Sequence, residues 1–177
     1  MEKKKIIIIG GGTAGASAAC LLQNKLGNIC DIEILASKKV PIVGVGEATV
    51  GNINQFLEAC NLDPEEVCLG DARGTIKYAV HCKDWYKENH SYFTPIGLFA
   101  MEYNDMYTFR RPIKEYWETW CGLKLGLRGK APFLKHEHWN TPIPKIWREY
   151  AYHIDAELLG KKLLDVAIER GATLRDV

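Results

Sequence analysis

Three glycines near the N-terminus have a spacing that suits the binding of phosphate groups. Gly10, Gly12 and Gly15 form a Gly-x-Gly-x-x-Gly pattern directly after the apolar run at residues 6–9. In a strand–turn–helix context, the first glycine permits a tight turn, the second lets a pyrophosphate approach the backbone, and the third lets the helix pack closely on the strand. Thr13 and Ala14 open the predicted helix, whose free N–H groups and positive dipole end favour an anion. A glycine turn without a ligand is the alternative, which this context disfavours.

The second predicted strand, at residues 32–35, lacks a feature that dinucleotide sites usually have. An Asp or Glu at the end of this strand normally accepts hydrogen bonds from the ribose hydroxyls, but Ala36 stands there. Glu33 lies too early in the strand, so Ser37 and Lys38 are the candidate substitutes. The sequence therefore predicts adenosine binding with a weakened hold on the ribose.

A second pair of glycines follows in "PIVGVGEATVGN", residues 41–52. Gly44 and Gly46 remove side chains before Thr49, which we predict to cap a helix reaching about Cys60. A nicotinamide dinucleotide does not need a second close approach of the backbone, whereas an extended FAD molecule could use one.

The rest of the chain contains a few further elements. Asp63 is the predicted N-cap of a helix that begins "DPEE", and Asp155 is the predicted start of an amphipathic helix to Arg170. Gly171 ends that helix, and "ATLRDV" is a predicted third parallel strand. The run at residues 6–9 is predicted to be a strand buried on both faces. Residues 83–150 give no clear pattern.

Lys77 lies in a segment, residues 76–82, that alternates as a strand does. In an unbroken strand, Lys77 shares one face with Thr75, Ala79 and His81. A lysine among small groups can be partly desolvated, which suits it to hydrogen-bond or capture an electrophile. A solvated lysine on an edge strand is the alternative, and the strand by itself favours that alternative.

Composition excludes several classes of function. The chain has 177 residues and a net charge of +1, so it shows no basic surface for nucleic acid or anionic membrane. It contains no apolar run of 18 residues, and its start "MEKKKIIIIG" lacks the long apolar region expected of a signal peptide. Its cysteines are scattered, which is typical of reduced thiols, and His136 and His138 lack a third metal ligand at a suitable spacing. We expect a cytoplasmic α/β protein with no metal site.

Glycines and aromatic residues are distributed unevenly. Ten of the 16 glycines lie in residues 1–74, whereas 17 of the 18 aromatic residues lie in residues 78–152. This asymmetry predicts a cofactor-binding core with the second glycine pair at residues 1–75. We expect a substrate-side segment carrying the lysine strand at residues 76–150, and the return helix and third strand at residues 151–177.

The motifs "GGGTAG" at 10–15, "GVGEAT" at 44–49 and the lysine of "TIKYAVHCKDW" at 75–85 together resemble the N-terminal part of the flavin-dependent halogenases of the tryptophan-halogenase type. The segment at residues 152–177 is also similar to that family. The resemblance implies a Rossmann-like FAD-binding fold of the two-glycine-loop flavoprotein type. A β-rich, aromatic-rich substrate-side segment would be inserted into it, and the fold would be incomplete.

The resemblance also implies a reaction. A separate flavin reductase supplies reduced FAD, which reacts with O2 to give a flavin hydroperoxide. A halide, chloride or bromide, attacks it to give hypohalous acid, which travels to a lysine beside an aromatic, indole-like substrate. Lys77 matches that lysine, and the family's GEAT segment, which borders the flavin, matches Gly46, Glu47, Ala48 and Thr49.

Several residues depart from the family pattern. Members with free tryptophan as substrate often read "HPFG" where this chain has Thr94, Pro95 and Ile96 before a glycine, so these three are substrate candidates for an aromatic compound of unspecified identity. Gly51 replaces a proline that usually follows GEAT, which predicts a looser segment.

The family's remaining motifs lie beyond the matched region. The chain could therefore be a fragment that needs a missing C-terminal half, a split subunit, a homodimer or a relic. Another flavin monooxygenase or reductase, or a non-catalytic nucleotide-binding fragment, remains an alternative.

Overall fold

The structure, a computed structural model, describes residues 3–37, 39, 44–96, 126–129 and 150–177. The chain divides into two compact units. The first comprises Met1–Thr49, Ile53–Thr75 and His153–Val177, and the second comprises Val50–Asn52 and Ile76–Tyr152. Each unit is described by itself below.

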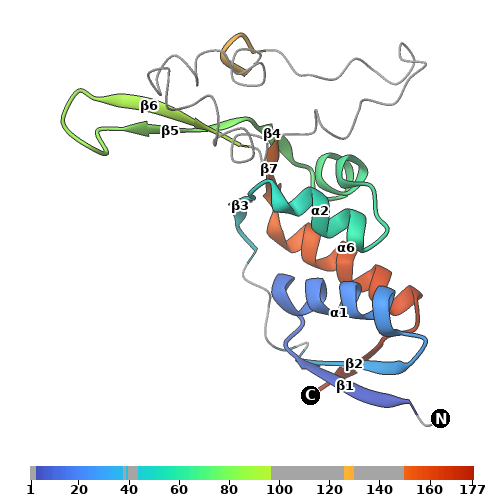
Figure 1. Cartoon of the computed structure of the whole chain (residues 1–177). Helices are drawn as coiled ribbons and strands as arrows, with labels where there is room; N and C mark the ends of the chain where they lie inside the picture. The colour runs from blue at the N-terminus through green and yellow to red at the C-terminus, as the bar shows by residue number, and fades with distance from the viewer. Residues whose placement is uncertain (1–2, 38, 40–43, 97–125, 130–149) are drawn as a thin grey trace, which may run out of the picture. The chain divides into compact units, whose positions relative to one another are not determined.

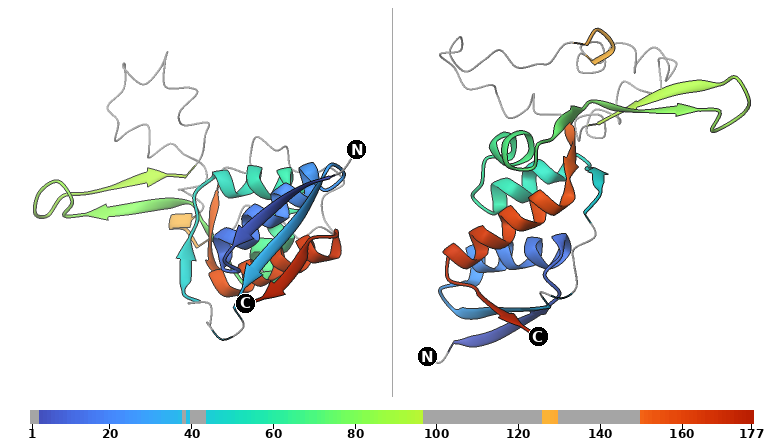
Figure 2. Two further views of the ribbon diagram at one scale, coloured as in Figure 1. Left: turned by 90° about the horizontal axis from the view of Figure 1, so that it is seen from below. Right: turned by 180° about the vertical axis from the view of Figure 1, so that it is seen from behind.

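A parallel three-stranded sheet forms the base of the first unit. Its strands are β1 (Lys4–Ile9), β2 (Cys30–Ala36) and β8 (Thr173–Asp176), in the order β1-β2-β8. Two helices, α1 (Thr13–Leu26) and α6 (Ala156–Glu169), lie on the same side of this sheet (Figures 1 and 2). The predicted strand–helix–strand unit and the third parallel strand are therefore confirmed.

The core of the first unit lies between this sheet and its helices. Ile32 and Ile34 of β2 are almost fully buried, and Ala16 and Ala19 of α1 are completely buried. These small side chains let α1 pack closely against its neighbours in the core. Across α6, the buried residues recur at helical spacing and fill the rest of the core: Leu159, Leu163, Val166 and Ala167.

The prediction that β1 is buried on both faces is wrong. Ile7 and Ile9 are 51% and 86% exposed, whereas Ile6 and Ile8 are half-buried. The reason is that β1 is an end strand of the described sheet, and the described helices cover only one face of it. On the other face, Glu33 forms ion pairs with Lys5 on β1 and Arg175 on β8.

The ends of α6 are those that the sequence predicts. The carboxylate of Asp155 accepts hydrogen bonds from the N–H groups of Glu157 and Leu158, at 3.0 and 3.1 Å. Gly171 has a φ of +108°, a left-handed conformation that glycine adopts readily after a helix. Both predictions are confirmed because helix caps depend on local chemistry.

The helix after the second glycine pair begins later than predicted. Helix α2 spans Asn52–Ala59, so Thr49 is not its N-cap. Asp63 does begin the next helical segment, since its carboxylate accepts hydrogen bonds from the N–H groups of Glu65 and Glu66. That segment continues as a π-helix, η1, over Glu66–Asp71.

The predicted strand at residues 76–82 is interrupted. Strand β4 (Thr75–Lys77) belongs to a sheet of order β3-β7-β4, with β3 at Gly46–Ala48 and β7 at Ala151–Asp155. Strand β5 (Ala79–Lys83) instead forms an antiparallel hairpin with β6 (Ser91–Pro95). The face that Lys77 was predicted to share with Ala79 and His81 therefore does not continue past Tyr78.

The two histidines considered as metal ligands, His136 and His138, lie outside the described residues.

In the part of the chain that is described, no helix is both long and apolar enough to cross a membrane.

Candidate functional site

The turn between β1 and α1 is held tightly by the backbone. Gly10 has a φ of +111° and donates its N–H to the carbonyl of Leu35 at 2.8 Å, which fastens the turn to the end of β2. A Cβ atom on Gly15 would collide with the carbonyl oxygen of Gly10. Glycine is thus required at both positions by the protein's own structure.

Gly12 differs from the other two glycines because nothing among the described residues requires a glycine there. Its φ of −71° and ψ of −179° form an extended conformation that any residue adopts, and it is the N-cap of α1. A Cβ atom on Gly12 would have no heavy atom within 4 Å among its neighbours. Open space at the start of a helix, beside a residue without a side chain, fits the close approach of a phosphate group.

The N-terminal ends of α1 and α6 lie together, but only the N-terminus of α1 is left uncapped for an anion. The hydroxyl of Thr13 donates to the carbonyl of Ala156 at 3.1 Å, and Gly160 lets Thr13 pack against α6. The first turn of α6 is capped by Asp155, whereas no described side chain caps α1. The N–H groups at the start of α1 are therefore the ones available to a ligand.

The hydrogen bond from Thr13 to Ala156 limits which groups of Thr13 and Ala14 can bind a cofactor. The side chain of Thr13 is engaged by α6, so its backbone N–H is the group left for a cofactor. Ala14 is exposed at the same end of α1. Sequence reasoning missed Gly160, although a lone glycine on the buried face of a predicted helix is a signal of close packing.

The end of β2 lies against the glycine turn. A Cβ atom on Gly11 would be only 2.7 Å from the Cβ of Ala36, so residue 36 faces the turn, where a ribose-binding acid is expected. Ser37 follows directly, and its hydroxyl accepts a hydrogen bond from the N–H of Lys39 at 3.4 Å. Lys38 lies outside the described residues.

The GEAT segment, residues 46–49, is mostly strand rather than a loop leading into a helix. Gly46, Glu47 and Ala48 form β3 and pair antiparallel with residues 153–155 of β7. All three are exposed, whereas Thr49 is half-buried.

The two glycines of this region have different reasons to be glycine. A Cβ on Gly44 would lie 2.7 Å from the Cβ of Glu157, so packing against α6 requires glycine there. A Cβ on Gly46 would meet only the carbonyl oxygen of Ile154, at 4.0 Å. Like Gly12, Gly46 is not required by its neighbours.

In the second unit, the structure brings the predicted lysine and the predicted substrate residues to one place. Lys77 is half-buried at the end of β4. The next residue, Tyr78, accepts a hydrogen bond at its carbonyl from the N–H of Ile96 at 2.8 Å, and Ala79 pairs with Pro95. The end of β6 therefore lies beside the end of β4, an arrangement that spacing in the sequence did not reveal.

Among the described residues of this junction, Ile96 supplies a buried apolar side chain. Ile96 is 9% exposed, and a Cβ atom on Gly51 would lie 3.8 Å from its Cγ2. Burial raises the pKa of Tyr78. Thr94 is exposed on β6.

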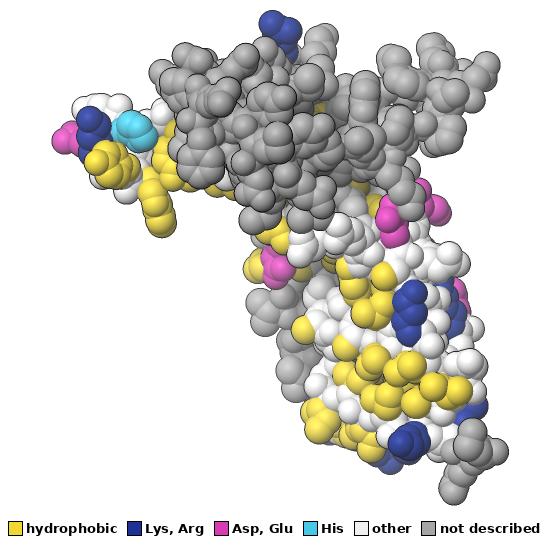
Figure 3. Space-filling model, viewed as in Figure 1, with side chains coloured by type: hydrophobic (Ala, Val, Ile, Leu, Met, Phe, Trp, Pro, Cys, Tyr) yellow, Lys and Arg dark blue, Asp and Glu magenta, His cyan; other side chains and the backbone are white. Residues whose placement is uncertain are grey.

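The β5–β6 hairpin carries aromatic side chains and ends in an exposed turn. His81 and Phe93 stack with ring centroids 4.2 Å apart across the two strands. Trp85 and Tyr86, in the turn, are 80% and 78% exposed. Figure 3 shows hydrophobic, acidic, basic and histidine side chains together at this end of the hairpin. Across the described residues, no group of three or more His, Cys, Asp or Glu side chains could hold a metal ion.

Comparison with known proteins identifies the family. The sequence model described as "Tryptophan halogenase" matches residues 5–177. The chain belongs to the tryptophan halogenase family. The structure also agrees with the Rossmann-like α/β fold that the resemblance predicts, because members of this family have the same architecture.

Two relatives show how far the similarity extends. The chain is 26% identical to the 7-chloro-L-tryptophan 6-halogenase KtzR of Kutzneria sp. (strain 744), over 90% of this chain and 35% of KtzR. It is 36% identical to the tryptophan 6-halogenase SttH of Streptomyces toxytricini, over 51% of this chain and 17% of SttH. The family membership therefore rests on similarity along most of the chain.

Solved structures agree with this assignment. The crystal structure of SttH matches with a TM-score of 0.75 and 25% identity, covering 99% of this chain and 38% of that one. The structure of Xcc4156, a flavin-dependent halogenase from Xanthomonas campestris, has the same fold, with a TM-score of 0.75 and 23% identity over 99% of this chain and 35% of that one. The chain thus spans little more than a third of the length of these relatives.

Proposed function

We propose that this chain is the FAD-binding and lysine-bearing part of a flavin-dependent halogenase that acts on an aromatic, indole-like substrate, as part of a longer chain or assembly. The observation that carries this proposal is Gly12, which has open space at the uncapped start of α1 although neither its backbone conformation nor its neighbours require glycine. Membership of the tryptophan halogenase family supplies the class of reaction.

The residues of the first unit fit the pyrophosphate of FAD. Gly10 and Gly15 hold the turn in place, and the N–H groups of Thr13 and Ala14 would bind the phosphate oxygens. Ser37 is the residue that we assign to the ribose, because Ala36 has no acceptor. Gly46 to Thr49 would border the flavin ring. Reduced FAD, when bound, supplies the activation of O2 that halide oxidation needs.

In the second unit, we assign to Lys77 the role of holding hypohalous acid by a hydrogen bond from its ammonium group. The apolar surroundings of Ile96 would exclude water from that lysine. Thr94, Pro95 and Ile96 are the residues that we assign to the aromatic substrate, since they lie beside the end of β4. We place this enzyme in the cytoplasm, with a separate flavin reductase as the supplier of reduced FAD.

The experiment uses the whole protein that carries this chain, with reduced FAD from a reductase, a panel of indoles, and chloride or bromide. We expect a halogenated product that depends on halide, and a loss of rate of about 100-fold or more in Lys77→Ala. Lys83→Ala, which removes an exposed lysine from β5, is the matched control and should keep full activity. Full halogenation by Lys77→Ala, with correct folding, would rule out the role assigned to Lys77.

The absence of an acid at position 36 favours a second candidate, a nucleotide-binding subunit without catalysis. A third candidate is a flavin monooxygenase or reductase in which Lys77 has no role with halogen. Oxygenated product without halide would identify the monooxygenase. FAD binding with no turnover of any substrate would identify the non-catalytic subunit.

A further inference from the structure

Two buried cysteines from different helices meet inside the first unit. Cys20 lies in the middle of α1, and Cys60 is the first residue after α2. Both are 0% exposed, and their thiols are hydrogen-bonded to one another. The proposed binding of FAD does not use either of them.

The surrounding hydrogen bonds fix this contact independently of the thiols. Asn24 lies one helical turn after Cys20 on the same face of α1, and its amide donates to the carbonyl of Ala59 at 2.9 Å. The guanidinium of Arg170 donates to the carbonyl of Cys60 at 2.5 Å and to the side-chain oxygen of Asn24 at 3.1 Å. The same face of α1 is thus held against the end of α2 at two neighbouring residues.

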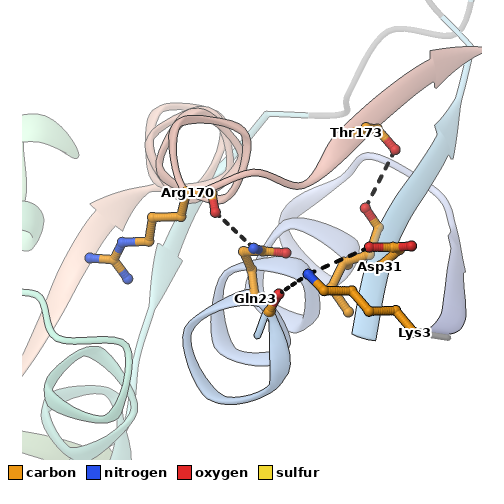
Figure 4. A network of polar contacts seen from close by, with 7 residues as sticks. Lys3, Gln23, Asp31, Arg170 and Thr173 are labelled. Atoms are coloured by element: carbon orange, nitrogen blue, oxygen red, sulfur yellow. Dashed lines mark hydrogen bonds and ion pairs between the residues drawn. The ribbon is translucent and has the colours of Figure 1, made fainter. Parts of the chain in front are cut away.

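The end of α6 completes this arrangement. The side chain of Gln23 donates to the carbonyl of Arg170 at 2.7 Å, a bond visible in Figure 4. Arg170 is therefore tied to α1 through its own backbone while its guanidinium reaches the end of α2. The two cysteines are held at contact distance by three segments of the chain.

The two thiols differ in the direction of their pKa shifts. The hydrogen bond from Cys60 lowers the pKa of Cys20, and the positive charge of Arg170 acts in the same direction. The same hydrogen bond raises the pKa of Cys60, as does its burial. Cys68 is equally buried, and burial raises the pKa of its thiol to about 12. Cys20 is therefore the better nucleophile of the pair.

We propose that Cys20 and Cys60 form a dithiol site that a small peroxide converts into a disulfide linking α1 to the end of α2. The sulfur of Cys20 attacks one oxygen of hydrogen peroxide, the O–O bond breaks, and the other oxygen leaves as water, so that Cys20 becomes a sulfenic acid. The sulfur of Cys60 then attacks the sulfur of Cys20, the S–O bond breaks, and a second water leaves with the proton of Cys60. Two thiols are oxidised by two electrons and one peroxide is reduced to two waters.

A small oxidant can reach the pair by a local opening of the chain. The residue after Cys60 is Asn61, which is exposed and has a φ of 57° in a tight turn. Turns of this kind open more readily than the helices that they join. Hydrogen peroxide is small enough to use such an opening, whereas glutathione disulfide is not. This inference does not depend on the proposed halogenase activity.

The test exposes the reduced, folded chain to increasing hydrogen peroxide, blocks the remaining thiols with an alkylating reagent, and maps the peptides by mass spectrometry. We expect a cross-linked peptide pair containing Cys20 and Cys60, which dithiothreitol reduces back to two thiols. These two thiols should be lost about tenfold faster than that of Cys68. The Cys68→Ala variant is the matched control and should form the same cross-link. In urea, the preference for this pair should disappear.

A Cys60→Ser variant, which keeps a hydrogen-bond donor beside Cys20 but no resolving thiol, separates the two steps. If it folds, Cys20 should proceed to sulfinic acid because no resolving thiol is present. The proposal is overturned if Cys20 and Cys60 in the native chain survive peroxide that oxidises Cys68. It is also overturned if Cys20 is oxidised without forming the cross-link, or if the cysteines pair indiscriminately in the folded chain.

Discussion

The glycine turn of the first unit and the lysine junction of the second unit differ in how their residues are held. At the turn, Gly10 and Gly15 are required by the backbone itself: Gly10 has a positive φ, and a Cβ on Gly15 would collide with the carbonyl of Gly10, five residues earlier. At the junction, residues 78–80, which follow Lys77, pair with residues 94–96 because two strands lie side by side. The need for glycine at the turn is thus set locally, whereas the junction depends wholly on pairing between two strands.

This difference also separates packing glycines from ligand glycines. Gly15 and Gly44 are small because another part of the protein occupies the space next to them. Among the described residues, a Cβ on Gly12 would have no heavy atom within 4 Å, and one on Gly46 would meet only the carbonyl oxygen of Ile154, at 4.0 Å. A glycine pattern in sequence combines both kinds, and only the structure separates them.

The largest effect is expected when the turn itself is broken. In Gly15→Ala, the new Cβ would run into the carbonyl of Gly10, so α1 has to move away from the turn. We expect a loss of about 3 kcal/mol in the free energy of unfolding, measured by urea denaturation. Gly12→Asp is the control, because aspartate is a good N-cap and has room; its stability should stay within about 0.5 kcal/mol of the native value. Equal losses in both variants would contradict the distinction between the two glycines.

The second-largest effect is expected at Arg170, where a substitution tests whether contacts between distant segments also stabilise the first unit. Arg170→Met keeps the length of the side chain but leaves the carbonyl of Cys60 and the oxygen of Asn24 without their donor. We expect a loss of about 1–3 kcal/mol by urea denaturation. Lys161→Met, at an exposed position on the same helix, should change stability by less than about 0.5 kcal/mol. An unchanged stability in Arg170→Met would mean that the helix ends do not need this bridge.

A smaller effect concerns the open face of the sheet. The hydrogen bond from Lys5 and the charge of Arg175 lower the pKa of Glu33. Stability from these contacts is present above the usual glutamate pKa of 4.5 and is lost as the pH falls through the lowered folded value. Between about pH 7 and about pH 3, the native chain should lose more stability than Glu33→Gln, measured by the midpoint of urea unfolding. Parallel pH profiles would show that the ion pairs contribute nothing.

The smallest effect is expected at Gly51, between the GEAT segment and α2. A side chain there would meet Ile96 at an ordinary contact distance, 3.8 Å, so Gly51→Pro should fold, with a gain of less than about 1 kcal/mol. Because proline restricts the backbone, we expect somewhat tighter binding of FAD in a titration of flavin fluorescence. If the affinity and the reactivity of the flavin are unchanged, the absence of proline does not loosen this segment.

Much of the first unit could be predicted from the sequence because its signals are local. The cap at Asp155, the end of α6 at Gly171 and the bounds of α1 follow from residues within one helical turn of each boundary. The open face of β1 could not be predicted in the same way, since burial of Ile7 depends on which elements cover the sheet.

The lysine strand shows the limit most clearly. Alternation through residues 76–82 predicts one strand, but β4 joins the sheet of β3 and β7 while β5 pairs with β6. Likewise, Thr49 is a good N-cap by residue type, yet α2 begins only at Asn52. In both cases the outcome depends on pairing with residues far away in the sequence, which local propensity does not contain.

The central claim is that the open space at Gly12 receives a phosphate of FAD, and one titration tests it directly. FAD is titrated into the chain and into Gly12→Asp, with flavin fluorescence as the readout and urea denaturation as the check of folding. The account predicts saturable binding by the native chain and an affinity about 100-fold or more lower in Gly12→Asp, because the carboxylate fills the space and repels the phosphate. Equal affinity of the two folded proteins for FAD would contradict it.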